Sequence, residues 1–125
     1  MVANIARGGR PILVVENDED TVAALRVFLT DEGYASVTAS DVERALDALE
    51  HDDPGLVLLD WTLDDGSGEE VLEAARCRST NPTPVILMTG ASNLNAQTSR
   101  SASAILKKPF DIGELLLVVA RHYRP

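Results

Sequence analysis

Hydrophobic residues along this chain gather in short unbroken runs instead of alternating with polar ones. Four runs of strand length are Ile12–Val15, Leu56–Leu59, Val85–Met88 and Ala104–Leu106, and Tyr34–Ala39 forms a fifth, more mixed stretch. A strand covered on both faces is apolar throughout, whereas a strand with one wet face alternates. The runs therefore predict five strands of a parallel sheet with helices on both faces.

The intervals between these runs carry helical periodicity. Val22 and Leu29 lie two turns apart on one face, and Gly33 follows them as a helix stop. Ser40 and Glu43 have the spacing of a capping box and predict the start of a second helix. A third helical stretch follows the run at 56–59.

The last two intervals between strands differ in how strongly they predict a helix. Residues 90–103 are rich in Ser and Asn and poor in apolar side chains, so they predict only a short or frayed helix. Asp111 and Glu114 have capping-box spacing at the start of the last predicted helix. Five strand–helix units in a row predict an α/β fold of three layers, (βα)5.

Composition narrows the class of protein. A chain of 125 residues suits one domain, and we expect residues 11–125 to form it after a flexible extension over residues 1–10. The formal net charge of −9 disfavours non-specific nucleic-acid binding. No run has the length of a membrane span or signal peptide, which predicts a cytoplasmic protein. We expect the single Cys77 to be a small buried or half-buried residue and not a reactive thiol.

Polar residues follow the predicted strands at one edge of the sheet, where the carboxyl ends of parallel strands meet. Oxygen ligands there would suit Mg²⁺. A hydroxyl and a lysine facing the same point would stabilise the charge of a phosphoryl group. The residues at these strand ends are Glu16, Asn17, Asp18, Asp60, Thr89 and Lys108.

Four ordered motifs give the chain its similarity to a known family, the receiver domain of bacterial response regulators. They are Ile-Leu-Val-Val-Glu-Asn-Asp at 12–18, Leu-Val-Leu-Leu-Asp at 56–60, Pro-Val-Ile-Leu-Met-Thr-Gly at 84–90 and Lys-Lys-Pro-Phe at 107–110. The resemblance covers residues 11–123. It implies a flavodoxin-like, doubly wound sheet with strand order 2-1-3-4-5. It also implies a signalling domain that only catalyses its own phosphorylation and dephosphorylation, and not an enzyme.

The resemblance also implies a role for each site residue. Asp60 matches the residue that accepts a phosphoryl group from a histidine kinase or histidine phosphotransfer protein, as aspartyl phosphate. Thr89, Gly90 and Lys108 match the phosphoryl-contacting positions, and the Lys108–Pro109 bond is often cis in this family. The implied Mg²⁺ ligands are Glu16, Asn17, Asp18, Asp60 and the backbone carbonyl of Thr62.

The resemblance extends to the partners. A receiver passes its signal to a downstream protein target, so we expect protein–protein contacts, no direct contact with nucleic acid and no membrane. We also expect a monomer or weak dimer, and no output domain within the chain.

Two departures from the family pattern bear on the mechanism. Asn17 stands where a carboxylate usually binds the metal, so we expect weaker Mg²⁺ binding, not its loss. Ile105 stands where the family usually keeps a Tyr or Phe that changes rotamer on activation. A switch would therefore depend on Thr89 and the segment after it.

Other functions stay open at this point. The same fold would also suit a degenerate receiver that binds a partner without phosphorylation. An aspartyl-phosphate phosphatase would need a second Asp at the position of Thr62, and a flavodoxin would need glycines and hydroxyls where the acidic stretch Glu16–Asp20 lies. The phosphorylated receiver is the leading hypothesis.

Overall fold

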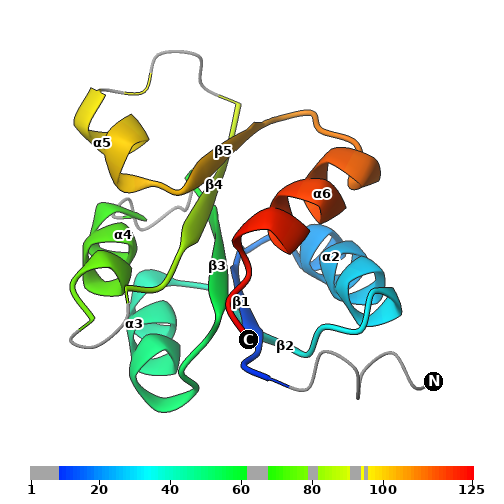
Figure 1. The fold of residues 1–125 in the computed structure, drawn as a ribbon, viewed down its shortest axis with the longest axis horizontal. Coiled ribbons are helices and arrows are strands. Elements are labelled where there is room, and N and C mark those ends of the chain that lie inside the picture. The colour runs from blue at the N-terminus through cyan, green and yellow to red at the C-terminus, as the bar shows by residue number, and fades with distance from the viewer. Residues whose placement is uncertain (1–8, 62–67, 79–81, 91–93, 95) are drawn as a thin grey trace.

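A computed structural model of the chain describes residues 9–61, 68–78, 82–90, 94 and 96–125. Within these ranges, strands and helices alternate along the chain (Figure 1). The strands are β1 (Ile12–Val15), β2 (Ser36–Ala39), β3 (Leu56–Asp60), β4 (Val85–Thr89) and β5 (Ala104–Lys107). The helices are α2 (Glu19–Asp31), α3 (Val42–His51), α4 (Gly68–Arg76), α5 (Ala96–Ser101) and α6 (Ile112–His122).

All the strands pair in parallel, in the order β2-β1-β3-β4-β5 that the resemblance implies. The chain first moves outward from β1 to β2 and then returns to the other side of β1 to form β3. This change of direction falls between β1 and β3, and open α/β sheets bind ligands at the carboxyl ends of the strands beside such a point. We call the region at these strand ends the crevice. The predicted fold class and strand order are confirmed.

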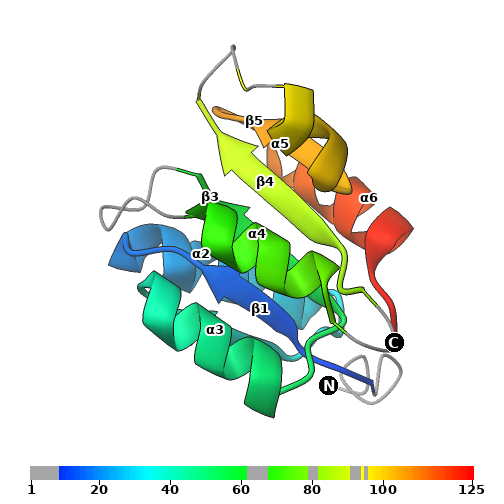
Figure 2. The same cartoon turned by 90° about the vertical axis from the view of Figure 1, so that its left-hand side faces the viewer.

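The core consists of two apolar layers, one on each face of the sheet. Helices α3, α4 and α5 cover one face, and α2 and α6 cover the other (Figures 1 and 2). Successive residues of a strand point to opposite faces, so Leu13 and Val15 enter one layer while Ile12 and Val14 enter the other. Burial on both faces is the physical reason for the unbroken apolar runs.

Helix α3 begins one residue later than the sequence predicts. The N-cap is Asp41, whose carboxylate accepts a hydrogen bond from the backbone N–H of Arg44 at 2.8 Å. The predicted capping box of Ser40 and Glu43 is therefore wrong. The hydroxyl of Ser40 instead accepts a hydrogen bond from the Arg44 guanidinium at 3.1 Å.

The other helix ends agree with the sequence. Asp111 and Glu114 form the predicted capping box of α6. Gly33 follows α2 with a φ of 91°, a left-handed conformation that glycine adopts without steric cost. Helix α5 has only six residues, as the weak apolar pattern of its segment predicts.

The predicted burial of Cys77 is wrong, because this residue is exposed just beyond the end of α4. Its thiol donates a hydrogen bond to the carboxylate of Glu73 at 3.2 Å. That bond raises the pKa of the Cys77 thiol, so the residue is exposed without being activated as a nucleophile.

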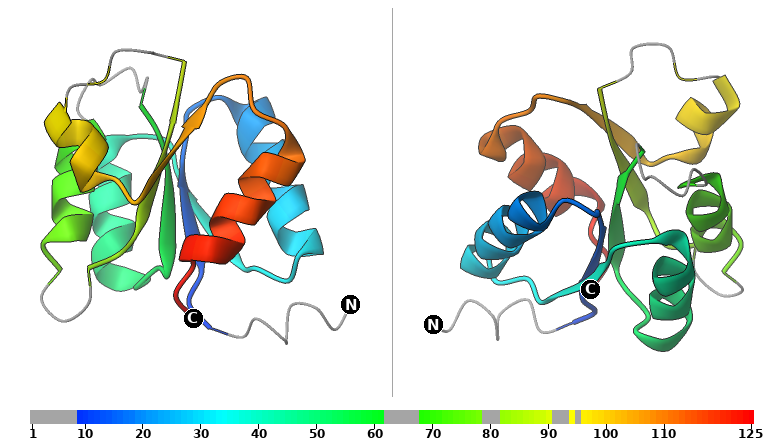
Figure 3. Two further views of the ribbon diagram at one scale, coloured as in Figure 1. Left: turned by 45° about the horizontal axis from the view of Figure 1, so that its top comes forward. Right: turned by 180° about the vertical axis from the view of Figure 1, so that it is seen from behind.

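The two ends of the described chain meet at the edge of the sheet opposite the crevice (Figure 3). The backbone N–H of Arg124 donates to the carbonyl of Gly55 at 3.1 Å, and the N–H of Gly55 donates to the carbonyl of Pro11 at 2.9 Å. The Tyr123 hydroxyl donates to the carbonyl of Arg10 at 2.6 Å. These bonds fix the starts of β1 and β3 against the C-terminal residues. The expected extension over residues 1–10 lies mostly outside the described residues and stays a prediction, as does the domain boundary.

None of the helices in the described part of the chain is both long enough and apolar enough to cross a membrane.

Substitution of Gly55 by Ala is expected to destabilise the fold by roughly 1–3 kcal/mol, because a Cβ at Gly55 would lie 2.1 Å from the backbone carbonyl oxygen of Arg124. Urea unfolding of the variant would measure the loss in the free energy of unfolding. Gly90→Ala is the matched control, since a Cβ at Gly90 would meet nothing within 4 Å. Equal stability of the two variants would contradict the close approach at Gly55.

Candidate functional site

Four strand ends bring the predicted site residues together in the crevice. Asp60 is the last residue of β3 and Thr89 the last residue of β4, while Glu16 follows β1 and Lys108 follows β5. Glu16, Asp60 and Thr89 are buried, with exposed fractions of 3%, 2% and 0%. Sequence position alone leaves these four residues far apart, and the parallel topology places them at one edge of the sheet.

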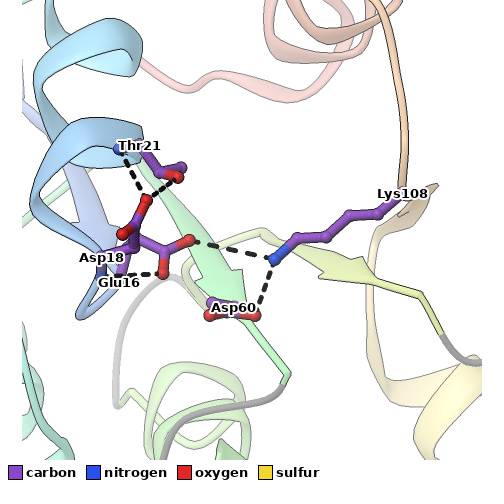
Figure 4. Close-up of polar contacts among 5 residues, drawn as sticks. All are labelled: Glu16, Asp18, Thr21, Asp60 and Lys108. Atoms are coloured by element: carbon purple, nitrogen blue, oxygen red, sulfur yellow. Dashed lines mark hydrogen bonds and ion pairs between the residues drawn. The ribbon is translucent and has the colours of Figure 1, made fainter.

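Lys108 lies between the two buried carboxylates (Figure 4). Its Nζ donates a hydrogen bond to Oδ1 of Asp60 at 3.1 Å and lies 4.0 Å from Oε1 of Glu16. The backbone N–H of Lys108 donates to the carbonyl of Thr89 at 2.7 Å, which fixes the end of β5 beside the end of β4. The bond from Lys108 to Pro109 is cis. One ammonium group thus faces two carboxylates.

Glu16 is the carboxylate that the fold satisfies least. Its Oε2 accepts a hydrogen bond from the backbone N–H of Asp18 at 3.2 Å, whereas its buried Oε1 has no hydrogen-bond partner. Burial raises the pKa of Glu16, and the neighbouring Asp60 raises it further. The backbone N–H of Asp18 and the charge of Lys108 lower it in part. Among the described residues, Oε1 of Glu16 therefore has the Lys108 ammonium at 4.0 Å as a cationic neighbour but accepts no hydrogen bond.

Asp18 has a local structural role that its predicted metal role did not include. Its carboxylate caps α2 by accepting hydrogen bonds from the N–H of Thr21 at 3.0 Å and from its hydroxyl at 2.5 Å. These bonds lower the pKa of Asp18. The carboxylate thus faces the first turn of α2, and Figure 4 shows it directed at Thr21 and away from Asp60.

The residues of the crevice fit a hard divalent cation. Glu16 Oε1 is a buried carboxylate oxygen without a hydrogen bond, and a cation there would supply the missing neighbour. In the part of the chain that the structure describes, no group of three or more His, Cys, Asp or Glu side chains would hold a metal by itself. Mg²⁺ accepts few protein ligands and keeps several waters, so two carboxylates with Asn17 beside them still suit it. The Thr62 carbonyl, a further predicted ligand, lies outside the described residues.

The remaining predicted residues lie around this cluster. Gly90 follows Thr89 and is exposed. Ile105 lies on the edge strand β5 with 40% of its side chain exposed. Trp61 directly follows Asp60, and its ring packs so close to Gly68 that a Cβ there would lie 3.0 Å away. The indole is therefore an optical probe next to Asp60.

Two arginines near the crevice were not predicted from the sequence. Arg26 of α2 and Arg44 of α3 line a cavity that Glu16 also lines. The sequence offered only a weak indication of them, because a single basic residue on an exposed helix face is usually solvated. Only the packing of α2 and α3 around β2 brings the two arginines to one cavity.

Replacement of Glu16 by Gln is expected to stabilise the metal-free protein at neutral pH by roughly 1 kcal/mol, the low end of the cost of an unsatisfied buried polar group. Burial raises the folded-state pKa of Glu16 above its ordinary 4.5. The free energy of unfolding therefore falls as the pH rises from 4.5 to that raised pKa. Urea unfolding in EDTA across a pH series would measure this. The advantage of Glu16→Gln is expected to vanish at pH below 4.5.

The matched control is Glu19→Gln, an exposed carboxylate in the first turn of α2. Removal of its charge at a helix N-terminus is expected to lower stability slightly. A loss of stability in Glu16→Gln at neutral pH would contradict the assignment of a charge that burial penalises.

Comparison with known proteins identifies relatives of the whole domain. The response regulator receiver domain family matches residues 12–120. The uncharacterised transcriptional regulatory protein YkoG of Bacillus subtilis is 36% identical over 108 residues, which are 84% of this chain and 47% of YkoG. The chain thus spans about half the length of the curated relatives it matches.

Two solved structures support the same relationship. Response regulator TrrA from Thermotoga maritima, in complex with Mg²⁺–BeF, is 30% identical with a TM-score of 0.80, covering 90% of this chain and 98% of TrrA. The receiver domain of NtrX from Brucella abortus is 31% identical with a TM-score of 0.78, covering 89% of this chain and 96% of that domain. The sheet order, the crevice and the family match agree: the chain belongs to the response regulator receiver domain family of two-component signalling.

Proposed function

We propose that this receiver domain is phosphorylated on Asp60 by a phosphohistidine donor, a histidine kinase or histidine phosphotransfer protein, in a Mg²⁺-dependent reaction. One observation carries the proposal: Lys108 Nζ lies 3.1 Å from the buried Asp60 carboxylate and 4.0 Å from the unsatisfied oxygen of Glu16. This geometry places a nucleophilic oxygen beside an ammonium group, which suits transfer of an anionic group.

The residues divide the chemistry between them. A carboxylate oxygen of Asp60 attacks phosphorus and forms the acyl phosphate as the P–N bond to the donor histidine breaks. The imidazole leaves as the neutral ring because its other ring nitrogen has first taken a proton from solvent. Lys108 then shifts its hydrogen bond from Asp60 to a phosphoryl oxygen, while Thr89 and Gly90 contact the others. Thr89 is the buried end of β4, so its position is fixed before transfer.

Mg²⁺ would neutralise charge on the phosphoryl oxygens when bound. Glu16, Asp60, Asn17 and the Thr62 carbonyl would hold it, and Asp18 would act through water because its carboxylate caps α2. TrrA, a relative of equal fold, is known in complex with Mg²⁺–BeF. That complex of a relative supports Mg²⁺ binding by this chain.

A switch after phosphorylation would depend on Thr89 more than on Ile105. A branched aliphatic side chain that is already 40% exposed cannot report the reaction by turning an aromatic ring inward. Thr89 ends β4, and the short helix α5 is the next element in the chain, so we expect a new contact from Thr89 to the phosphoryl group to change the position of α5. The signal would then pass to a downstream protein.

A second candidate function is a degenerate receiver that binds its partner without phosphorylation. The amide of Asn17 in the metal position and the loss of the aromatic residue at Ile105 favour it. YkoG is named a transcriptional regulatory protein. The expectation that this chain makes no nucleic-acid contact therefore stays a prediction, as do its cytoplasmic location and its monomeric or weakly dimeric state.

Incubation with phosphoramidate and Mg²⁺ is expected to add one phosphoryl group to the protein, and Asp60→Asn is expected to abolish the addition. Intact-mass spectrometry measures it directly. Asp47→Asn is the matched control, since Asp47 is an exposed carboxylate on α3. No addition to the wild-type protein at saturating Mg²⁺ would favour the degenerate receiver.

Substitution Asn17→Asp is expected to tighten Mg²⁺ binding by about tenfold, equivalent to ~1.4 kcal/mol, because it restores a carboxylate beside Glu16. Titration of Trp61 fluorescence with MgCl₂ measures the dissociation constant. Gln97→Glu on α5 makes the same change from amide to carboxylate away from the crevice and is expected to leave the constant unchanged. Equal affinity of wild type and Asn17→Asp would exclude residue 17 from the metal site.

A further inference from the structure

A cavity of about 440 Å³ opens at the carboxyl end of the edge strand β2, next to the candidate site. Residues of α2, of α3 and of the carboxyl end of β2 line it, and α2 and α3 cover opposite faces of the sheet at this edge. Glu16 forms part of its wall toward Asp60. Its volume is in the range of pockets for small molecules. Of its lining residues, Glu16 and Asn17 also belong to the proposed metal site, and the others take no part in the proposed phosphoryl transfer.

Two guanidinium groups line this cavity. Arg26 is exposed and makes no hydrogen bond or ion pair with any residue in the described ranges. Arg44 uses only its Nη1, which donates to Ser40 Oγ at 3.1 Å and to Asp41 Oδ2 at 3.3 Å. Both arginines therefore keep donors available in the planar arrangement that matches carboxylate and phosphate oxygens.

The rest of the lining limits what such an anion would be. Val22, Ala23 and Ala39 give the cavity an apolar surface between its polar groups. Glu16 and Glu19 lie in the same wall and would repel a ligand with charges along its length. A compact molecule with one anionic end and an apolar body is complementary to this arrangement, whereas a polyanion such as nucleic acid is not.

We propose that this cavity binds a small organic monoanion with an apolar body, whose charged group is held by Arg26 and Arg44. Binding is coupled to the crevice through Glu16, which belongs to both. A divalent cation beside Glu16 offsets the negative charge of that wall, so Mg²⁺ tightens anion binding, and by reciprocity the anion tightens Mg²⁺ binding. The coupling, unlike the cavity itself, rests on the proposed function.

Titration with hexanoate, followed by backbone amide NMR shifts at fixed ionic strength in EDTA, tests the cavity alone. Saturable shifts are expected for residues 22–26 and 38–44, with none for hexylammonium, the probe of opposite charge. Arg26→Gln and Arg44→Gln are expected to weaken binding by about tenfold each, as for the loss of one charge-assisted hydrogen bond. The matched control is Arg121→Gln, a change at an exposed residue of α6. This variant is expected to bind hexanoate as the wild-type protein does.

A third variant tests the space of the cavity without changing its charged residues. Ala23→Phe adds a ring to the exposed lining residue and is expected to abolish hexanoate binding while the melting temperature is retained. Shifts that do not saturate, equal effects of Arg26→Gln and Arg121→Gln, or equal binding of hexylammonium would each overturn the proposal.

Repetition of the titration in Mg²⁺ tests the coupling. A several-fold gain in hexanoate affinity is expected at Mg²⁺ concentrations that change Trp61 fluorescence. An unchanged affinity at those concentrations would overturn the coupling while the cavity stands. A Trp61 signal that never responds to Mg²⁺ would count against the proposed metal site instead, so the two failures are distinguishable.

Discussion

The buried pair of Glu16 and Asp60 is the constraint on which the arrangement of this domain depends. Two carboxylates lie side by side at the end of a parallel sheet with a single ammonium group, Lys108, within 4.0 Å of both. Such a site costs free energy to fold because burial disfavours charge, and the raised pKa of Glu16 records that cost. The surrounding apolar layers, buried on both faces of the sheet, offset it.

The parallel sheet is what makes the costly arrangement possible. Each strand delivers one polar residue to the same edge, and the reversal of strand order beside β1 leaves that edge open between β1 and β3. The backbone N–H of Lys108 donates to the Thr89 carbonyl. This bond fixes the position from which the Lys108 side chain extends to the two carboxylates. An unsatisfied oxygen at Glu16 turns the same edge into a place that favours a cation.

Two residues at this edge of the sheet also belong to neighbouring parts of the fold. Glu16 belongs to the wall of the cavity beside α2 as well as to the crevice, and Thr89 ends β4, the strand that precedes α5 in the chain. Short elements such as α5 have few contacts that resist a shift, whereas the core strands are buried on both sides.

The sequence by itself determined the strands, the sheet class and the identity of the crevice residues. Apolar runs without alternation require burial on both faces, and polar residues directly after them must share one edge. It also placed the cap of α6, because a capping carboxylate acts on the backbone within three residues. Only the tertiary structure decided what depends on distant neighbours. Examples are the oxygen of Glu16 without a hydrogen bond and the place of Arg26 and Arg44 in the lining of one cavity. These features depend on which helices and strands pack together. The spacing of residues along the sequence does not reveal that packing.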